Sequence, residues 1–140
     1  TFDTFTRAVV GDLGASRTDF QASEDDNVLV QGITGDIYSL GYFGHAYLEE
    51  NREYLKVIPV DGGLGCVPPT AETILDGSYS PLGRRLFLYV KRASLQNPGA
   101  MAFLRFFLTH APDLVPSSGF FPLPESDYRE SLRQLEAASG

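Results

Sequence analysis

The spacing of apolar and polar positions predicts three main helices. Over residues 1–10 apolar side chains recur at helical spacing, Thr1 stands at the N-cap and Gly11 supplies a stop. Residues 98–110 are apolar on nearly all sides, which predicts a helix that is buried over most of its surface. Residues 125–137 have the pattern of an amphipathic terminal helix.

Shorter helices are expected in the first half of the chain. The run Ser-Glu-Asp-Asp at 23–26 resembles a capping box and predicts a helix that begins at Ser23 and is ended by Gly32 and Gly35. A helical turn is expected at 45–51 and a short helix at 70–75.

Three runs have the pattern of strands: 39–44, 54–60 and 84–91. The last is the clearest, because alternate aliphatic and aromatic side chains make both of its faces apolar while both ends are charged. That pattern predicts an interior strand of a covered sheet. Strands that alternate with helices indicate an α/β fold.

Size and charge narrow the function classes. The chain has 140 residues and 15.3 kDa, with 18 acidic and 11 basic side chains and a net charge of −7. This balance argues against general nucleic-acid binding and against a polybasic membrane anchor. A small anion is still an acceptable ligand, because a few backbone N–H groups can hold one whatever the net charge.

Candidate catalytic groups are few. No Gly-x-Ser-x-Gly motif accompanies the two histidines, His45 and His110, so hydrolase chemistry has little support. His45 is expected to begin a helix, and His110 to interact with the dipole at a helix end. Cys66 lies in a glycine-rich loop without a nearby histidine, which favours an unreactive thiol.

Two further motifs favour structural roles. The run Asp-Gly-Gly-Leu-Gly at 61–65 lacks the Lys-Ser/Thr pair and the following helix of a phosphate-binding loop, so it predicts a strand-to-loop turn. The acidic residues at 24–26 lack the spacing of a calcium loop and are expected to cap a helix. No metal site is predicted.

One local feature suggests ligand chemistry. Thr1 directly precedes an apolar-faced helix, where its hydroxyl and the free N–H groups of the first turn can face an anion. An ordinary N-cap threonine has the same pattern, and the residues alone favour that simpler interpretation.

Seven stretches carry a family resemblance, and they follow one another in order over nearly the whole chain. The stretches are Thr-Phe-Asp-Thr-Phe at 1–5, Ser-Arg-Thr-Asp-Phe at 16–20, Ser-Glu-Asp-Asp-Asn-Val-Leu-Val-Gln-Gly at 23–32, Leu-Gly-Tyr-Phe-Gly-His-Ala-Tyr at 40–47, Glu-Thr-Ile-Leu-Asp-Gly-Ser-Tyr at 72–79, Pro-Leu-Gly-Arg-Arg-Leu-Phe-Leu-Tyr-Val at 81–90 and Gly-Phe-Phe-Pro-Leu-Pro at 119–124. Together they resemble the phosphate-binding subunit of the bacterial phosphate ABC importer, a periplasmic solute-binding protein, especially its cyanobacterial branch. The family usually has Ser-Arg-Pro where this chain has Gly-Arg-Arg at 83–85.

The resemblance implies an α/β fold of the class II periplasmic-binding-protein type, with two lobes around a hinge. Residues 1–82 would form most of the second lobe. Residues 83–140 would supply a crossover strand and helices that complete the first lobe. The chain would then be the C-terminal portion of a receptor: one lobe plus the elements that return to the other lobe.

The resemblance also implies a phosphate site. Thr1 matches the threonine of a Ser-Gly-Thr run that opens a helix, and Phe2 would supply the next amide. The family's other arginine, aspartate and serine or threonine ligands come from earlier in its sequence and have no counterpart here. No catalytic residue, metal or cofactor is implied.

The function implied is that of a phosphate-binding receptor component of an ABC importer, not an enzyme, which captures inorganic phosphate between two lobes. The implied partners are phosphate, an ABC permease and a complementing N-terminal chain or segment. The implied location is periplasmic or extracytoplasmic, as a secreted or lipid-anchored protein. The alternatives are a secreted phosphate-binding relative that acts as an interaction or inhibitor protein and, ranked lowest, an α/β hydrolase-like enzyme.

A last expectation concerns assembly. Met101, Phe103, Phe106 and Phe107 predict an exposed apolar patch larger than soluble monomers usually tolerate. The chain is therefore expected to bind a complementing N-terminal chain or, failing that, to associate with itself.

Overall fold

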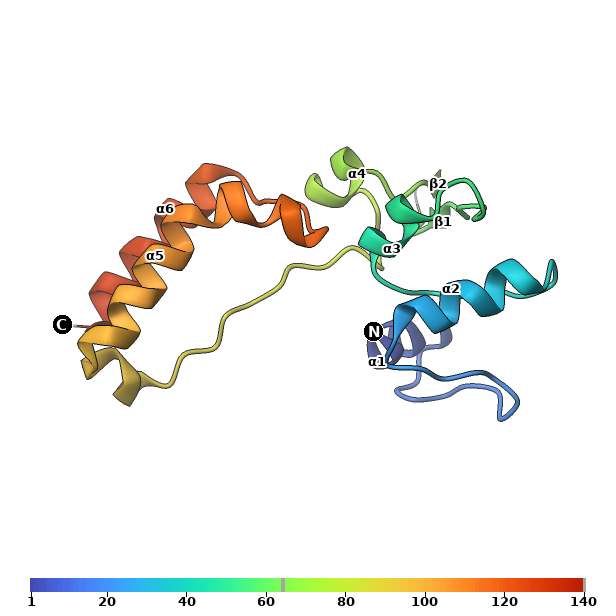
Figure 1. The fold of residues 1–140 in the computed structure, drawn as a ribbon, viewed down its shortest axis with the longest axis horizontal. Helices are drawn as coiled ribbons and strands as arrows, with labels where there is room; N and C mark the ends of the chain where they lie inside the picture. Colours follow the sequence, from blue (N-terminus) through green and yellow to red (C-terminus); the bar gives the residue numbers. More distant parts are fainter. Residues whose placement is uncertain (64, 140) are drawn as a thin grey trace. The chain divides into compact units, whose positions relative to one another are not determined.

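The computed structural model describes residues 1–63 and 65–139, and the chain divides into two compact units, Thr1–Arg84 and Arg85–Gly140. The first unit contains helix α1 (Phe2–Phe5), the π-helical turn η1 (Thr6–Val10), helices α2 (Asp26–Gly35), α3 (His45–Glu50) and α4 (Ala71–Leu75), and strands β1 (Val60–Asp61) and β2 (Cys66–Val67) (Figure 1). The second contains the 3₁₀ turns η2 (Arg92–Gln96) and η3 (Pro116–Ser118) and helices α5 (Pro98–Leu114) and α6 (Glu125–Ser139). Whether these units correspond to two lobes of a receptor stays a prediction.

The first helix confirms the boundaries read from the sequence. Thr1 occupies the N-cap, α1 continues without a break into η1, and Gly11 ends the helix. Gly11 has φ = +85°, a left-handed conformation that suits a residue without a Cβ atom. The second half is wound more loosely than expected, because the amide of Gly11 donates to the carbonyl of Thr6 at 3.0 Å, five residues back.

Helix α2 begins later than predicted. Its N-cap is Asp25, whose Oδ1 accepts a hydrogen bond from the Asn27 amide at 3.0 Å. The Ser23 hydroxyl instead accepts from the Asp25 amide at 3.0 Å and forms a turn before the helix. The predicted start at Ser23 is therefore wrong by three residues. Gly32 lies inside the helix, which ends at Gly35.

The two shorter helices confirm their predictions. Helix α3 begins at His45, and α4 follows Thr70. Thr70 and Thr73 cap each other: Thr70 Oγ1 accepts from the Thr73 amide at 3.2 Å, and Thr73 Oγ1 accepts from the Thr70 amide at 2.9 Å. This reciprocal arrangement satisfies two amide groups at the start of α4.

The strand predictions are largely wrong for this chain. One short antiparallel ladder forms, with Val60 opposite Val67 and Asp61 opposite Cys66. Only the last residue of the predicted run 54–60 is paired, and among the described residues 39–44 and 84–91 form no strand. In Figure 1 the second of these segments, in yellow, is drawn without helix or strand. An apolar alternating run needs a neighbouring strand to bond to, and residues 1–63 and 65–139 supply none for these segments.

The second unit is a helical hairpin. Helices α5 and α6 lie side by side (Figure 1). Asn97 caps α5, because its Oδ1 accepts from the amides of Gly99 at 2.8 Å and Ala100 at 3.3 Å. Helix α5 runs beyond the predicted end at His110 to Leu114.

The core of this hairpin is small. It consists of Leu95, Met101 and Leu104, with Leu135 of α6 packed against them. Only one face of α5 is covered, and Phe103 on the same helix is 61% exposed. The expectation that α5 is buried on most sides is thus wrong for this chain. Met101, only 6% exposed, does not belong to the predicted apolar patch.

No helix in the described part of the chain is long and apolar enough to cross a membrane.

Candidate functional site

The start of α1 presents the predicted site residue Thr1 at the surface. Thr1 is exposed, and its carbonyl accepts the first helical hydrogen bond from the Phe5 amide at 2.9 Å. Among the described residues its side chain makes no cap hydrogen bond. The amides of the first turn have no acceptor within the helix, because helix geometry provides none at this end. The Thr1 hydroxyl and the first-turn amides therefore have no hydrogen-bond partner from within the helix.

Two aromatic stacks hold this helix start in place. The rings of Phe2 and Phe20 lie parallel with centroids 5.5 Å apart, and those of Phe5 and Tyr42 with centroids 3.8 Å apart. Burial raises the pKa of the Tyr42 hydroxyl. The second predicted site residue, Phe2, thus contributes its ring to packing and leaves its amide at the first turn of the helix.

Thr6 fastens the helix to the loop that follows. Its side chain is 2% exposed. Its hydroxyl accepts a hydrogen bond from the Gly14 amide at 2.9 Å and lies 3.1 Å from the Phe2 carbonyl, to which it donates. A buried side chain with these bonds ties the loop after Gly11 to the first turn of α1. Sequence reasoning missed this role, since it depends on how the loop folds back.

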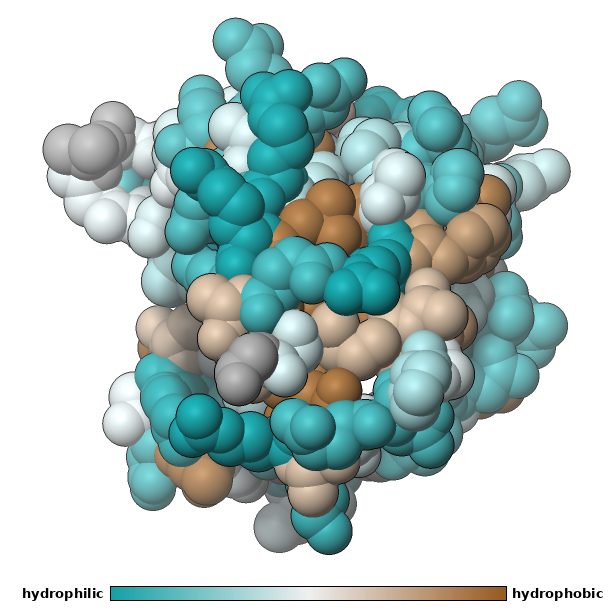
Figure 2. Space-filling model, turned by 90° about the vertical axis from the view of Figure 1, so that its left-hand side faces the viewer, coloured by the Kyte–Doolittle hydropathy of each residue, from teal (hydrophilic) through white to brown (hydrophobic). Residues whose placement is uncertain are grey.

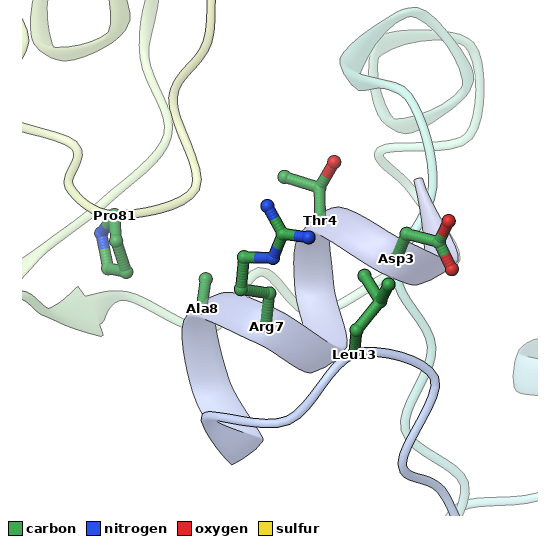
Figure 3. Close-up of a pocket in the computed structure, with 6 residues that line it drawn as sticks. All are labelled: Asp3, Thr4, Arg7, Ala8, Leu13 and Pro81. Atoms are coloured by element: carbon green, nitrogen blue, oxygen red, sulfur yellow. The ribbon is translucent and has the colours of Figure 1, made fainter.

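An open cavity of about 400 Å³ lies beside the same helix, lined by Asp3, Thr4, Arg7, Ala8, Leu13 and Pro81 (Figure 3). Figure 3 shows the Arg7 guanidinium on the side of Thr4, while the Asp3 carboxylate points away from it. Thr1 and Phe2 are not among the residues that line this cavity.

Arg84 reaches this helix from the far end of the first unit. Its Nη1 donates a hydrogen bond to the Thr4 hydroxyl at 2.6 Å. The sequence placed Arg84 only as a flank of a strand, because a contact across 80 residues leaves no local signal. The structure therefore brings one arginine, besides Arg7, to the helix that carries Thr1.

Both histidines contact groups that stabilise the fold. His45 Nε2 lies 3.3 Å from the Pro69 carbonyl oxygen and 3.4 Å from Glu49 Oε1. The ring of His110 lies against Phe106, with centroids 4.5 Å apart. His110 lies inside α5 and not at its end, so the expected interaction with a helix terminus is wrong.

The glycine-rich run at 61–65 forms a turn, and in the described part of the chain the structure assigns no ligand to it or to Cys66. Asp61 Oδ1 accepts from the amides of Gly63 at 2.8 Å and Gly65 at 3.0 Å, which forms the predicted turn after β1. Leu64, within this motif, lies outside the described residues. Cys66 carries a free, exposed thiol. Among residues 1–63 and 65–139, no three acidic, histidine or cysteine side chains gather as a metal site would require.

Comparison with known proteins identifies relatives over the whole chain, although no family model matches it. The chain is 50% identical to Protein SphX of Synechocystis sp. over 129 residues, which are 91% of this chain and 38% of that protein. It is 37% identical to Protein SphX of Synechococcus elongatus over 98% of its length, and 35% identical to the phosphate-binding protein PstS of Staphylococcus saprophyticus over 100%. These matches cover 41% and 43% of the two relatives.

A solved structure agrees with these relatives. The crystal structure of a possible phosphate binding protein from Planctomyces limnophilus superposes on 99% of this chain with a TM-score of 0.78 and 39% identity. The match covers 50% of that protein. The chain thus spans half or less of the length of the relatives it matches. The resemblance read from the sequence is confirmed, and so is the periplasmic-binding-protein-like fold class, of which this chain is a partial domain.

Proposed function

From this kinship with SphX and PstS proteins, we propose that the chain is part of a receptor that binds inorganic phosphate, with Thr1 and Phe2 among the ligands. The observation that carries the proposal is the exposed start of α1, where the Thr1 hydroxyl makes no cap hydrogen bond and the first-turn amides have no helical acceptor. Relatives named as phosphate-binding proteins supply the identity of the anion.

The chemistry suits reversible capture. Phosphate accepts hydrogen bonds from the Thr1 hydroxyl and the Phe2 amide, and the positive end of the helix dipole adds a favourable interaction. The Phe2 ring stacks on Phe20, so the residue that supplies this amide is packed against the loop that follows the helix. We assign no catalysed reaction to these residues.

These donors alone bind phosphate weakly. Tight capture needs charge-assisted hydrogen bonds, above all a bidentate arginine. Arg84 already donates to the Thr4 hydroxyl, and Arg7 lines the neighbouring cavity, whose lining does not include Thr1. The family's remaining ligands are expected from a complementing N-terminal segment. The isolated chain is therefore an incomplete phosphate site.

The family resemblance also suggests how phosphate is captured and where it is delivered. We propose that phosphate is enclosed between two lobes, to which residues 1–82 and 83–140 contribute as predicted, and that the closed receptor delivers it to an ABC permease. The receptor works outside the cytoplasm, as a secreted or lipid-anchored protein.

Calorimetry with inorganic phosphate tests the proposal. The chain is measured alone and joined to the N-terminal part of a SphX relative, in three forms: unchanged, Thr1→Ala and Thr18→Ala. Thr18 is an exposed threonine in a turn and serves as the matched control. We expect tight binding only in the joined receptor. Thr1→Ala should weaken it about tenfold, the value of one strong hydrogen bond to a charged group, while Thr18→Ala leaves it unchanged.

Three outcomes contradict the proposal in different ways. Unchanged affinity in the Thr1→Ala receptor removes Thr1 from the site. Tight binding by the isolated chain overturns the incomplete site. Turnover of a phosphoester by either form shows an enzyme instead of a receptor.

A further inference from the structure

Two arginines approach one threonine hydroxyl in the first unit. Arg84 Nη1 donates a hydrogen bond to Thr4 Oγ1 at 2.6 Å. Arg7 lines the cavity beside the same helix, and Figure 3 shows its guanidinium on the side of Thr4. Arg84 is the last residue of the first unit, so all three side chains belong to one compact unit. Positive charge is thus concentrated around a single hydroxyl group.

Neither of these guanidinium groups is neutralised by a carboxylate. The other arginines of this unit, Arg17 and Arg52, each hold a carboxylate oxygen, at 2.7 and 2.9 Å. Asp3 stands four residues before Arg7, the spacing at which opposite charges pair on a helix, yet Figure 3 shows its carboxylate pointing away. Among residues 1–63 and 65–139, neither arginine at the cavity forms an ion pair.

The groups that remain open at this place are hydrogen-bond donors. Arg84 uses one N–H on Thr4, and within the described part of the chain its other N–H groups and those of Arg7 have no acceptor. Thr4 Oγ1 accepts from Arg84, so the hydroxyl proton of Thr4 is free to point elsewhere. A guanidinium has donors and no acceptor. The arrangement therefore suits a ligand that is negatively charged and accepts hydrogen bonds.

The size and charge of the cavity narrow the class of ligand. It is open and has a volume of about 400 Å³, in the range of small-molecule sites, which is about 300–1,000 Å³. The N–H fork of an arginine matches two oxygens of one oxyanion. Two cations attract a dianion more strongly than a monoanion. Since the Asp3 carboxylate points away, it does not accept a proton from the ligand, and an anion without a proton is bound as well as one that carries it.

We propose that Thr4, Arg7 and Arg84 form a second anion site, which holds a small tetrahedral dianion and does not distinguish sulfate from phosphate. Thr1 and Phe2 do not line this cavity, so the site is separate from the proposed phosphate site and does not depend on it. A dianion bound by both arginines links the first helix to the end of the first unit. Its binding therefore stabilises this unit, because the folded form alone brings the two guanidinium groups together.

The experiment titrates the 140-residue chain with sodium sulfate, inorganic phosphate and sodium acetate at constant ionic strength. Calorimetry gives the affinity, and the NMR signals of the arginine Nε–H groups show where the anion binds. We expect sulfate and phosphate to bind with similar affinity and acetate more weakly. The signals of Arg7 and Arg84 should shift while that of Arg52 stays in place. Added sodium chloride should weaken the binding.

Substitutions with opposite expected effects sharpen the test. Arg7→Gln and Arg84→Gln should each weaken sulfate binding about tenfold, because each removes a hydrogen bond from a charged donor. Arg52→Gln removes the same charge from an exposed ion pair of the same unit and should leave the affinity unchanged. Asp3→Asn removes the negative charge that lines the cavity and should tighten binding, which a misfolded variant would not do.

The joined receptor separates this site from the proposed phosphate site. We expect sulfate to shift the Arg7 signal there as well, with or without Thr1→Ala. Equal sulfate affinity in the unchanged chain and the Arg7→Gln variant overturns the proposal. So does an Arg7 signal that responds in the isolated chain but not in the joined receptor, because the rest of the receptor then covers the cavity.

The two proposals fail separately. If the joined receptor binds phosphate tightly and sulfate leaves the Arg7 and Arg84 signals in place, only the second anion site is wrong. If sulfate shifts these signals and tight phosphate binding is absent, only the proposed function is wrong.

Discussion

The Thr6 hydroxyl links the first helix to the loop that follows it. It lies in a 2% exposed side chain, donates toward the Phe2 carbonyl and accepts from the Gly14 amide. Gly14 itself is exposed, so its amide can turn to water when the acceptor is lost, and the loss of such a hydrogen bond costs about 0.5–1.5 kcal/mol. The position of Gly14, and through it of the loop after the helix, therefore depends on one oxygen atom.

Replacing this hydroxyl tests its role. Thr6→Val keeps the shape of the side chain and removes the oxygen, and we expect the free energy of unfolding to fall by about 0.5–1.5 kcal/mol in denaturant titrations. Thr6→Ser keeps the oxygen and should lose distinctly less. Equal losses in the two variants would show that packing of the methyl group, and not the hydrogen bonds, makes the residue important.

The contrast between Thr1 and Thr6 shows what a sequence can predict at the scale of single residues. The cap position of Thr1 is a local feature, visible from the apolar residues just after it and from Gly11 at the other end. The bonds of Thr6, and the donation from Arg84 to Thr4, depend on segments that return from elsewhere. Local periodicity contains no information about such contacts.

Among the secondary-structure elements, the helices followed the sequence far better than the strands. A helix forms its backbone hydrogen bonds within its own segment, so a capping residue such as Asn97 or Thr70 marks where it begins. The backbone hydrogen bonds of a strand are made only with a neighbouring strand. The alternating pattern at 84–91 therefore indicates a segment that can form a strand. Among the described residues, no neighbouring strand is present for it to pair with.

An ion pair also joins α5 to α6. Arg105 donates twice to Glu136, at 2.6 Å from Nε to Oε1 and 2.7 Å from Nη2 to Oε2. This hydrogen bonding holds the pKa of the Glu136 carboxyl below its ordinary value of 4.5; desolvation acts in the opposite direction, and the charge of Arg105 makes a smaller contribution that also lowers the pKa. Both side chains are half-exposed, so water and salt weaken the pair considerably.

The pH dependence follows from the sign of that shift. A carboxyl group whose pKa is lower in the folded state stabilises the fold above its unfolded pKa, and this contribution is lost as pH falls through the folded pKa. We expect Glu136→Gln to lower the thermal midpoint at pH 7 by about 2 °C or less. The difference from the unchanged chain should disappear below the ordinary glutamate range.

Thermal scans from neutral pH to about pH 3 measure this, with Glu50→Gln as a control carboxyl on the surface of the other unit. A midpoint difference for Glu136→Gln that stayed constant over the whole range would show that the ion pair does not contribute through its charge.

At the scale of the whole molecule, each unit taken by itself leaves large apolar side chains exposed. Figure 2 shows hydrophobic residues, in brown, open between hydrophilic ones in teal. The exposed residues lie in both units: Ile37, Tyr38 and Leu40 after α2, Leu86–Val90 before η2, and Phe103 and Phe106 on α5. The net charge of −7 opposes association of identical chains but acts only over about a Debye length, so it slows contact without removing the gain from burial. Phe103 and Phe106 are exposed on one helix, so the face of α5 is the surface on which we expect two copies to meet.

Sedimentation of the isolated chain tests this expectation. We expect species heavier than 15.3 kDa whose share grows with concentration, because burial of apolar area drives association at about 25 cal/mol per Å². Phe103→Ser together with Phe106→Ser should shift the distribution toward the monomer without unfolding α5, since both side chains lie outside the buried cluster around Met101 and Leu104. Tyr54→Ser, another exposed aromatic residue, should leave it unchanged. A single 15.3 kDa species at every concentration would mean that the open apolar surface is tolerated in solution, and the case for a complementing chain would then rest on phosphate affinity alone.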